Sequence, residues 1–162
     1  MNFKDIDLVQ EPNSKSSLRL WIRLLKSSRI IENKLRDKLR REFSTTMPRF
    51  DVMAALFRFE KGLKMNELSK LLMVSNGNVT GIVDRLVKDG LIVRMPVAGD
   101  RRAFEVRLTK KGHQEFSHQA QQHEAWVDEM LASFCEKDSE ELLQKLDGLI
   151  SALSDPSLEV KK

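Results

Sequence analysis

The sequence of 162 residues has a single cysteine, Cys135, and no apolar stretch long enough to cross a membrane. One cysteine excludes a disulfide framework and a multi-cysteine zinc site, so we expect a reducing compartment. A membrane span requires roughly 20 apolar residues. The first residues, Met1 to Glu11, alternate charged with apolar side chains and do not resemble a signal peptide. We therefore expect a cytoplasmic protein without a membrane segment.

Residues typical of catalysis or metal binding are also scarce. The chain has three histidines, His113, His118 and His123. Their five-residue spacing turns successive side chains by about 140° on a helix, so we expect no metal site. Because Glu136 opposes a thiolate at Cys135, this thiol is expected to be buried and inert. No nucleophile with a neighbouring base, phosphate-binding glycine loop or paired carboxylates is recognisable, so we predict neither an enzyme nor a cofactor.

The net charge of +4 is unevenly distributed along the chain. Residues 1–44 contain 11 basic and 6 acidic side chains, residues 45–112 contain 13 and 7, and residues 113–162 contain 4 and 11. The basic excess in the first two thirds suggests contact with a polyanion. The acidic last third lies away from that partner, or it only aids solubility.

Glycines separate long helices from a region of turns. Six of the seven glycines lie from Gly62 to Gly112, so turns are expected there and long helices at the two ends. Between Leu18 and Phe43, apolar residues recur at helical spacing with Arg and Lys between them. A helix of this length is expected to pack against a partner helix.

The next predicted helix follows a pair of threonines. Thr45 or Thr46 is the expected N-cap, Pro48 suits the first turn, and the helix ends near Phe59 before Gly62. Its buried stripe consists of Phe50, Met53, Ala54 and Phe57.

Two shorter helices joined by a tight turn come next. The first is predicted from Met65 to Met73, and the second begins after an N-cap at Ser75 and stops at Gly90. The inward residues of the first are Leu68, Leu71 and Leu72, and those of the second are Val79, Ile82, Val83 and Leu86.

The periodicity then changes from helical to alternating. Residues 91–95 are predicted to form a strand stopped by Pro96, residues 97–102 a turn, and residues 104–108 a second strand. We therefore expect a two-stranded hairpin.

Two helices are predicted for the rest of the chain. Thr109 is the expected N-cap of a long helix, a break falls at Glu136 to Asp138, and a last helix ends before Asp155. The apolar face of that last helix contains Leu142, Leu146, Leu149 and Leu153.

Two short helices followed at once by a hairpin are typical of a winged helix-turn-helix. In such a domain the second helix enters the major groove of DNA and the hairpin, or wing, approaches the minor groove. We predict a mainly α fold with a small β-hairpin wing. Residues 1–44 form the arm and a long dimerisation helix, residues 45–112 the DNA-binding domain, and residues 113–162 the C-terminal dimerisation helices.

The predicted DNA-facing residues lie opposite the apolar stripe of the second helix. Asparagine pairs with adenine, threonine contacts a thymine methyl or a phosphate, and basic side chains neutralise phosphates. Two glycines near the start of a helix each cost about 1 kcal/mol relative to alanine, which argues against an ordinary solvated face. The candidates are Ser75, Asn76, Gly77, Asn78, Thr80, Gly81, Arg85 and Lys88.

The predicted wing tip contains Asp100, Arg101 and Arg102 after Gly99. An arginine at this position can enter a narrow minor groove, and Asp100 can orient a neighbouring guanidinium. The alternative is an ordinary charged turn, which its position directly after the DNA-facing helix disfavours.

Three segments resemble the MarR family of transcriptional regulators: residues 65–69 (MNELS), residues 75–91 (SNGNVTGIVDRLVKDGL) and residues 99–112 (GDRRAFEVRLTKKG). The resemblance implies a homodimer formed by the first and last helices and bound to a palindromic operator in double-stranded DNA. It also implies that Arg102 is the minor-groove residue and Asp100 its support. Unburied apolar faces on the terminal helices favour the same dimer.

The resemblance further implies a small effector between the dimerisation helices and the winged domain, often an aromatic or phenolic anion. The segments SNGNVTG and TTMPRFDV are similar to regulators of aromatic-acid catabolism that respond to hydroxycinnamates or their coenzyme A thioesters. Arg49 lies in the first turn of a helix, where an anion is favoured. The candidate lining is Trp21, Leu25, Arg49, Phe50, Met53 and Phe57; alternatively, the apolar members are core residues.

The sequence therefore predicts a ligand-responsive repressor that binds a palindromic operator. A non-specific or architectural DNA-binding protein without an effector is the alternative. The preference for an operator over random duplex DNA distinguishes the two.

Overall fold

The computed structural model describes residues 14–97 and 100–154. The described residues up to His123 form one compact unit, and those from Glu124 onward form a second. No helix in the described ranges is long and apolar enough to span a membrane.

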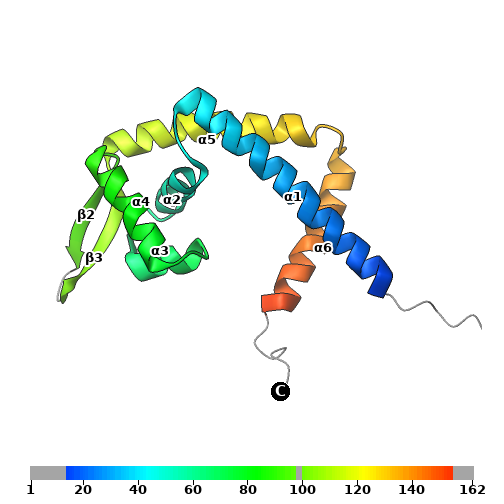
Figure 1. Ribbon diagram of the computed structural model, residues 1–162, viewed down its shortest axis with the longest axis horizontal. Coiled ribbons are helices and arrows are strands. Elements are labelled where there is room, and N and C mark those ends of the chain that lie inside the picture. Colours follow the sequence, from blue (N-terminus) through cyan, green and yellow to red (C-terminus); the bar gives the residue numbers. More distant parts are fainter. Residues whose placement is uncertain (1–13, 98–99, 155–162) are drawn as a thin grey trace, which may run out of the picture. The chain divides into compact units, whose positions relative to one another are not determined.

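The first unit contains four helices, a small sheet and the start of a fifth helix (Figure 1). The second unit contains the rest of that fifth helix and a sixth. In chain order the elements are α1 (Ser14–Phe43), α2 (Met47–Arg58), β1 (Leu63–Lys64), α3 (Met65–Leu71), α4 (Asn76–Lys88), β2 (Ile92–Val97), β3 (Asp100–Leu108), α5 (Lys110–Leu131) and α6 (Glu136–Ser154). The predicted fold class, mainly helical with a hairpin wing, is confirmed.

The first two helices have the sequence signals expected for them. In α1, Leu35 and Leu39 are buried, whereas the half before Ile31 has no buried residue. Thr46 is the N-cap of α2 and Pro48 lies in its first turn, although the Thr46 side chain makes no capping hydrogen bond. Of the predicted buried stripe of α2, Phe50 and Met53 are buried, but Ala54 is only half-buried and Phe57 is exposed. Val52, Ala55 and Leu56 complete the buried face.

The sheet has three antiparallel strands in the order β1-β3-β2. The predicted hairpin is present, but β1 was missed because two residues are too few for an alternating pattern. The prediction that Pro96 ends a strand is wrong. Pro96 lies inside β2 and pairs with Phe104. A proline is tolerated there because β2 is an edge strand, whose outer side needs no hydrogen-bond donor. Asp100 to Arg102, expected in a turn, begin β3, while Ala98 and Gly99 lie outside the described residues.

The two helices of the helix-turn-helix, α3 and α4, end in the same hydrogen-bond pattern. After α3, which is two residues shorter than predicted, Met73 has φ 53° and Val74 N–H donates to Ser69 O at 3.1 Å. After α4, Gly90 has φ 73° and Leu91 N–H donates to Leu86 O at 2.9 Å. Both ends are Schellman motifs, which need a left-handed residue at this position. Glycine adopts that conformation freely, whereas Met73 does not.

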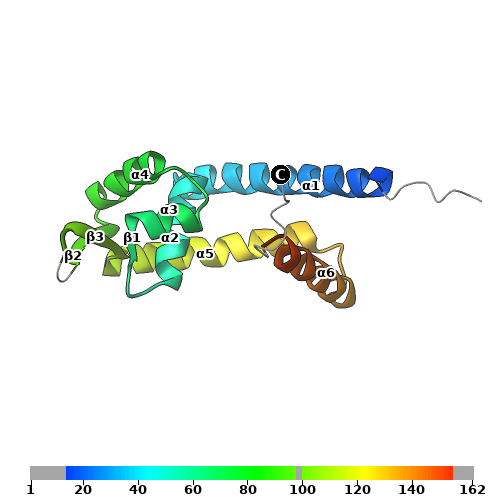
Figure 2. The same cartoon turned by 90° about the horizontal axis from the view of Figure 1, so that it is seen from below.

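One threonine joins α4, the sheet and α5. Thr109 Oγ1 donates to Gly90 O at 2.7 Å and accepts from Gly112 N–H at 3.0 Å, which confirms its role as the cap of α5. Thr109 N–H also donates to Leu91 O at 3.0 Å. A Cβ on Gly112 would lie 2.1 Å from Leu91 O, so only glycine permits this approach. The end of α4 is thereby held against the start of α5. Figure 2 shows the neighbouring packing of α3 and α4 beside the sheet.

In the second unit, α6 begins earlier than predicted. The expected break at Glu136 to Asp138 is wrong, because both acidic residues lie in the first turn of α6, where the helix dipole favours them. Cys135 Sγ accepts a capping hydrogen bond from Asp138 N–H at 3.5 Å and donates to Asp138 Oδ2 at 3.0 Å. This thiol is exposed, which corrects the expectation of a buried one. In α6 itself no residue is buried.

Replacing Met73 by Gly is expected to stabilise the first unit by about 0.5–1 kcal/mol, because glycine removes the strain of a positive φ. Met73 is 92% exposed, so no packing is lost. Gly90→Ala, at the matched position of α4, should instead lose about 1 kcal/mol. Thermal and denaturant unfolding measure both changes. A destabilised Met73→Gly variant would contradict the strain argument.

Candidate nucleic-acid interface

The fourth helix, α4, separates apolar from polar residues as the sequence predicts. Val79, Val83 and Leu86 are buried, and Ile82 is half-buried. Ser75 Oγ accepts from Asn78 N–H at 3.4 Å, which confirms the N-cap. All eight candidate residues are exposed, namely Ser75, Asn76, Gly77, Asn78, Thr80, Gly81, Arg85 and Lys88. The Thr80 hydroxyl donates to Asn76 O at 2.8 Å and keeps its lone pairs available.

The two glycines of α4 have no packing role in this chain. A Cβ built at Gly77 or at Gly81 would meet no atom within 4 Å. Neither residue has a positive φ, so alanine would fit the backbone at both positions. Both glycines therefore lower the stability of α4, and no contact within the chain compensates for this loss.

An ion pair links α4 to the hairpin. Arg94 of β2 donates from Nη2 to Asp84 Oδ1 on α4, and both side chains are partly exposed. Such a surface pair adds little stability. The Arg94 guanidinium instead offsets the negative charge that Asp84 places on the polar face of α4. Sequence reasoning missed Arg94, because ten residues separate it from Asp84 and only the packing of β2 against α4 brings them together.

The predicted wing residues lie at the start of β3. The backbone of Asp100, Arg101 and Arg102 belongs to this strand, which pairs with β2. Their side chains lie outside the described part of the structure, so their roles stay predictions.

Four of the predicted effector residues, Arg49, Phe50, Met53 and Phe57, lie on α2, and the two aromatic ones contact α5. The Phe50 ring is 5.3 Å from Phe116 and stacks on His123 at 4.6 Å, and the Phe57 ring is 5.0 Å from Phe116. Phe50 and Met53 are buried, and Phe57 is 41% exposed. Burial lowers the pKa of His123, so the neutral ring is favoured in this cluster.

The remaining effector candidates are Trp21 and Leu25 on α1 and the charged residue Arg49 on α2. Trp21 is exposed and Leu25 half-buried, both in the first half of α1. Trp21 lies about 20 Å along the helix axis from Leu35, where α1 enters the core, so one chain does not bring it to Phe50. Arg49 Nη2 donates to Asp89 Oδ2 at 2.6 Å, which links α2 to the end of α4.

A shallow hollow of about 390 Å³ lies between α2 and the end of α3. Its lining residues are Asp51, Ala54, Ala55, Arg58, Leu71, Leu72 and Met73. Partial burial, and secondly the nearby Glu32 carboxylate, raise the pKa of Asp51 above its usual value. Sequence reasoning did not select this residue, because Glu32 lies on a different helix.

Each of the three histidines, whose spacing predicts no metal site, contacts a phenylalanine ring. His118 contacts Phe43 at 5.3 Å, and His113 contacts Phe57 at 5.5 Å. In the described part of the chain, no group of three His, Cys, Asp or Glu side chains could hold a metal ion.

The order of elements and the exposed polar face of α4 define a winged helix-turn-helix protein. A family model described as the MarR family matches residues 45–104. The transcriptional activatory protein BadR of Rhodopseudomonas palustris is 31% identical over 123 residues, which are 74% of this chain and 70% of BadR.

Solved structures give the same result. A MarR family transcriptional regulator from Silicibacter pomeroyi has a TM-score of 0.75 and 31% identity, covering 90% of this chain and all of that one. The fold is also that of Sco3205, a MarR family transcriptional regulator from Streptomyces coelicolor crystallised in complex with DNA, with a TM-score of 0.77, 18% identity and coverage of 90% and 92%. The chain belongs to the MarR family, whose members are transcriptional regulators and not enzymes.

Replacing Asp51 by Asn is expected to raise the free energy of unfolding at pH 7 by less than about 1 kcal/mol, because it removes a partly buried charge near Glu32. The folded-state pKa lies above the unfolded value of 3.8, so wild-type stability rises as the pH falls through the folded-state pKa. The advantage of the variant should therefore disappear near pH 3.8. Denaturant titrations across this range test it, and a pH-independent difference would contradict the cause assigned to the pKa shift.

Proposed function

We propose that this protein is a sequence-specific transcriptional regulator that binds a palindromic operator as a homodimer. The observation that carries this proposal is the face of α4, where exposed polar residues surround two glycines that no internal packing requires. A helix with this face can approach the major groove closely. The DNA complex of Sco3205, which has the same fold, supports this use of the fold.

In the proposed complex, the N-terminal part of α4 contacts the bases and its C-terminal part contacts phosphates. Asn76 and Asn78 suit adenine, and Arg85 and Lys88 suit the backbone. The ion pair with Arg94 limits repulsion between Asp84 and the phosphates. Arg102, supported by Asp100, extends from the wing into the adjacent minor groove.

Two copies of the chain present two α4 helices to a two-fold symmetric site. The first half of α1 and the whole of α6 have no buried residue, and both carry exposed apolar side chains, such as Trp21 and Ile150. Surface of this kind favours association with a second copy. Bound to its operator, the dimer blocks access to the promoter and so represses.

The test is the ratio between operator and random-duplex affinity at physiological salt. An operator selected from a random library should be preferred by roughly 10³-fold or more, with a two-fold symmetric footprint. Lys88→Ala should reduce the salt dependence of binding, whereas Asn78→Ala should alter base preference. A flat preference with an asymmetric footprint would favour the architectural alternative.

Gly81→Ala separates the stability of α4 from its contact with DNA. The variant should gain about 1 kcal/mol in unfolding free energy, since alanine is the better helix former and its Cβ meets nothing. Its operator affinity should fall at least about tenfold, because the methyl group occupies the interface.

The matched control for this variant is Gly148→Ala. Gly148 lies on α6, where a Cβ also meets no atom within 4 Å. Because α6 belongs to the proposed dimer, dimerisation of the control is measured as well. With the dimer unchanged, the control should gain helix stability without losing operator affinity. Unchanged DNA binding by Gly81→Ala would argue against the proposed docking.

We also propose that an aromatic carboxylate, or its coenzyme A thioester, releases the operator. The effector residues on α2 lie beside α5, and α1 of the second copy supplies Trp21 and Leu25. Arg49 is the anion ligand, and its pairing with Asp89 makes the effector a competitor for the contact that holds α2 to the end of α4. Breaking this pair changes the support of the DNA-binding helix.

Calorimetry with a hydroxycinnamate and its coenzyme A thioester tests the effector. Arg49→Ala should lose binding of the form that the wild type binds. Asp89→Asn, which removes the competing carboxylate, should bind it more tightly. Absence of binding for both forms would refute this effector class, and equal affinity in all three proteins would refute the role of Arg49.

A further inference from the structure

One side of α2 forms the floor of the hollow of about 390 Å³ that lies beside the end of α3. Asp51, Ala54, Ala55 and Arg58 stand at i, i+3, i+4 and i+7, a spacing that places them on one side of a helix. Asp51 and Arg58 are attached about 10 Å apart along the helix axis, with the two small alanine side chains between them. The floor is therefore acidic at one end, apolar in the middle and basic at the other end.

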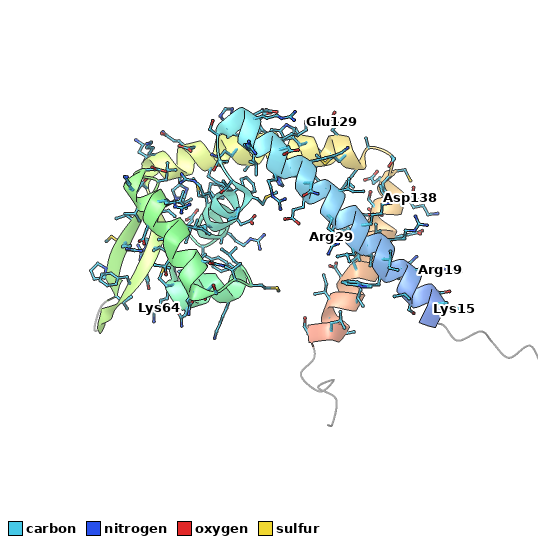
Figure 3. All side chains as sticks on the ribbon, viewed as in Figure 1. Lys15, Arg19, Arg29, Lys64, Glu129 and Asp138 are labelled. Atoms are coloured by element: carbon cyan, nitrogen blue, oxygen red, sulfur yellow. The ribbon has the colours of Figure 1, made fainter. Side chains whose placement is uncertain are left out.

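The wall of the hollow is formed by the end of α3 and the turn that follows it. Leu71, predicted to face inward, is 44% exposed, and Met73 is 92% exposed. Met73 also has a positive φ, which glycine would adopt without strain. In Figure 3, the labelled Lys64 marks the start of α3, and the wall lies at the opposite end of that helix. Backbone strain of this kind is often retained at ligand sites.

The carboxylate of Asp51 has no side-chain partner in the part of the chain that the structure describes. It forms neither an ion pair nor a hydrogen bond there, and Arg36 of α1 pairs with Glu32 instead. Partial burial, and secondly the Glu32 carboxylate, raise the pKa of Asp51. Both effects disfavour the charged form of Asp51, whereas a cation beside it would favour that form.

We propose that this hollow binds a protonated amine that bears an aromatic ring, with the ammonium group beside Asp51 and the ring between Met73 and the two alanines. The wall supplies apolar contact, and a methionine thioether interacts favourably with the edge of an aromatic ring. Arg58, at the far end of the floor, stacks its planar guanidinium on the ring. The ligand thus neutralises the unpaired carboxylate and covers the exposed wall.

This site goes beyond the proposed function and differs from the proposed effector site at Arg49. The ligand has the opposite charge, and its contacts come from α2 and α3, whereas the effector residues on α2 lie beside α5. From Met73 the chain continues through Val74 to Ser75, the N-cap of α4. The bound amine therefore lies at the entry to the helix that faces DNA in the proposed complex.

Three ligands of similar shape and different charge test the site in the full-length chain. They are 2-phenylethylamine, the neutral 2-phenylethanol and the anionic 3-phenylpropionate. The amine should bind with a dissociation constant of roughly 1 mM, as expected for so small a ligand, and should shift the NMR signals of the Met73, Ala54 and Ala55 methyl groups. The alcohol and the acid should shift these signals at least about tenfold more weakly, because neither supplies a cation to Asp51.

Four variants locate the bound amine. Asp51→Asn keeps the shape of the side chain and should weaken amine binding at least about tenfold. Glu60→Gln, an equal loss of charge outside the hollow, should bind as the wild type does. Met73→Gly should bind the amine several-fold more weakly although it stabilises the fold, which separates a ligand contact from a structural role. Arg49→Ala should bind the amine normally.

Four results would overturn the inference. Equal affinity for the three ligands would show that the charge is not recognised, and unchanged amine binding by Asp51→Asn would place the amine elsewhere. Loss of amine binding in Arg49→Ala would assign the amine to the proposed effector site. Absence of shifts at the three methyl groups up to about 10 mM amine would show that the hollow binds no such ligand. The proposed regulator is tested separately, because its operator preference is measured without the amine.

Discussion

The joint where α4 ends is the constraint on which the rest of the winged domain depends. Gly90 turns the chain out of α4, Thr109 binds the carbonyls of Gly90 and Leu91, and Gly112 lets α5 approach Leu91 O. Three separate segments are thus fixed at one point by short hydrogen bonds and one missing side chain. These contacts attach the end of α4 to the sheet and to the start of α5, and so set the direction in which its polar face points.

Basic and acidic side chains are concentrated in different parts of the chain. The DNA-facing surface proposed for α4 carries Arg85 and Lys88, and its one carboxylate, Asp84, is held by Arg94. The acidic residues gather in the last third, above all in α6. A net charge of +4 conceals both features. Segregation of this kind lets one part of the chain meet a polyanion while the acidic residues lie in another part.

Prediction from the sequence was most accurate where a local signal acts alone. Ser75, Thr109 and Gly90 lie where caps and stops were expected, because capping depends only on neighbouring residues. The prediction that Pro96 ends a strand was wrong, because an edge strand such as β2 tolerates a proline that a central strand would not. The prediction of a buried thiol at Cys135 was wrong, because α6 has no buried residue and the thiol at its N-terminus is exposed. The pairs Arg49–Asp89 and Arg94–Asp84 join residues that no local pattern relates.

Periodicity and turn chemistry, both local properties, were sufficient for the order of the helices and the hairpin and for the buried face of α4, whereas three sequence segments carried the resemblance to the MarR family. The partners of charged groups, the third strand and the absence of any packing need for Gly77 and Gly81 followed from the folded chain. The reason is that these features depend on distances between segments far apart in the sequence. Helical spacing tells which side of α4 is polar, and only the packing around α4 reveals that no atom of the chain occupies the space beside its glycines.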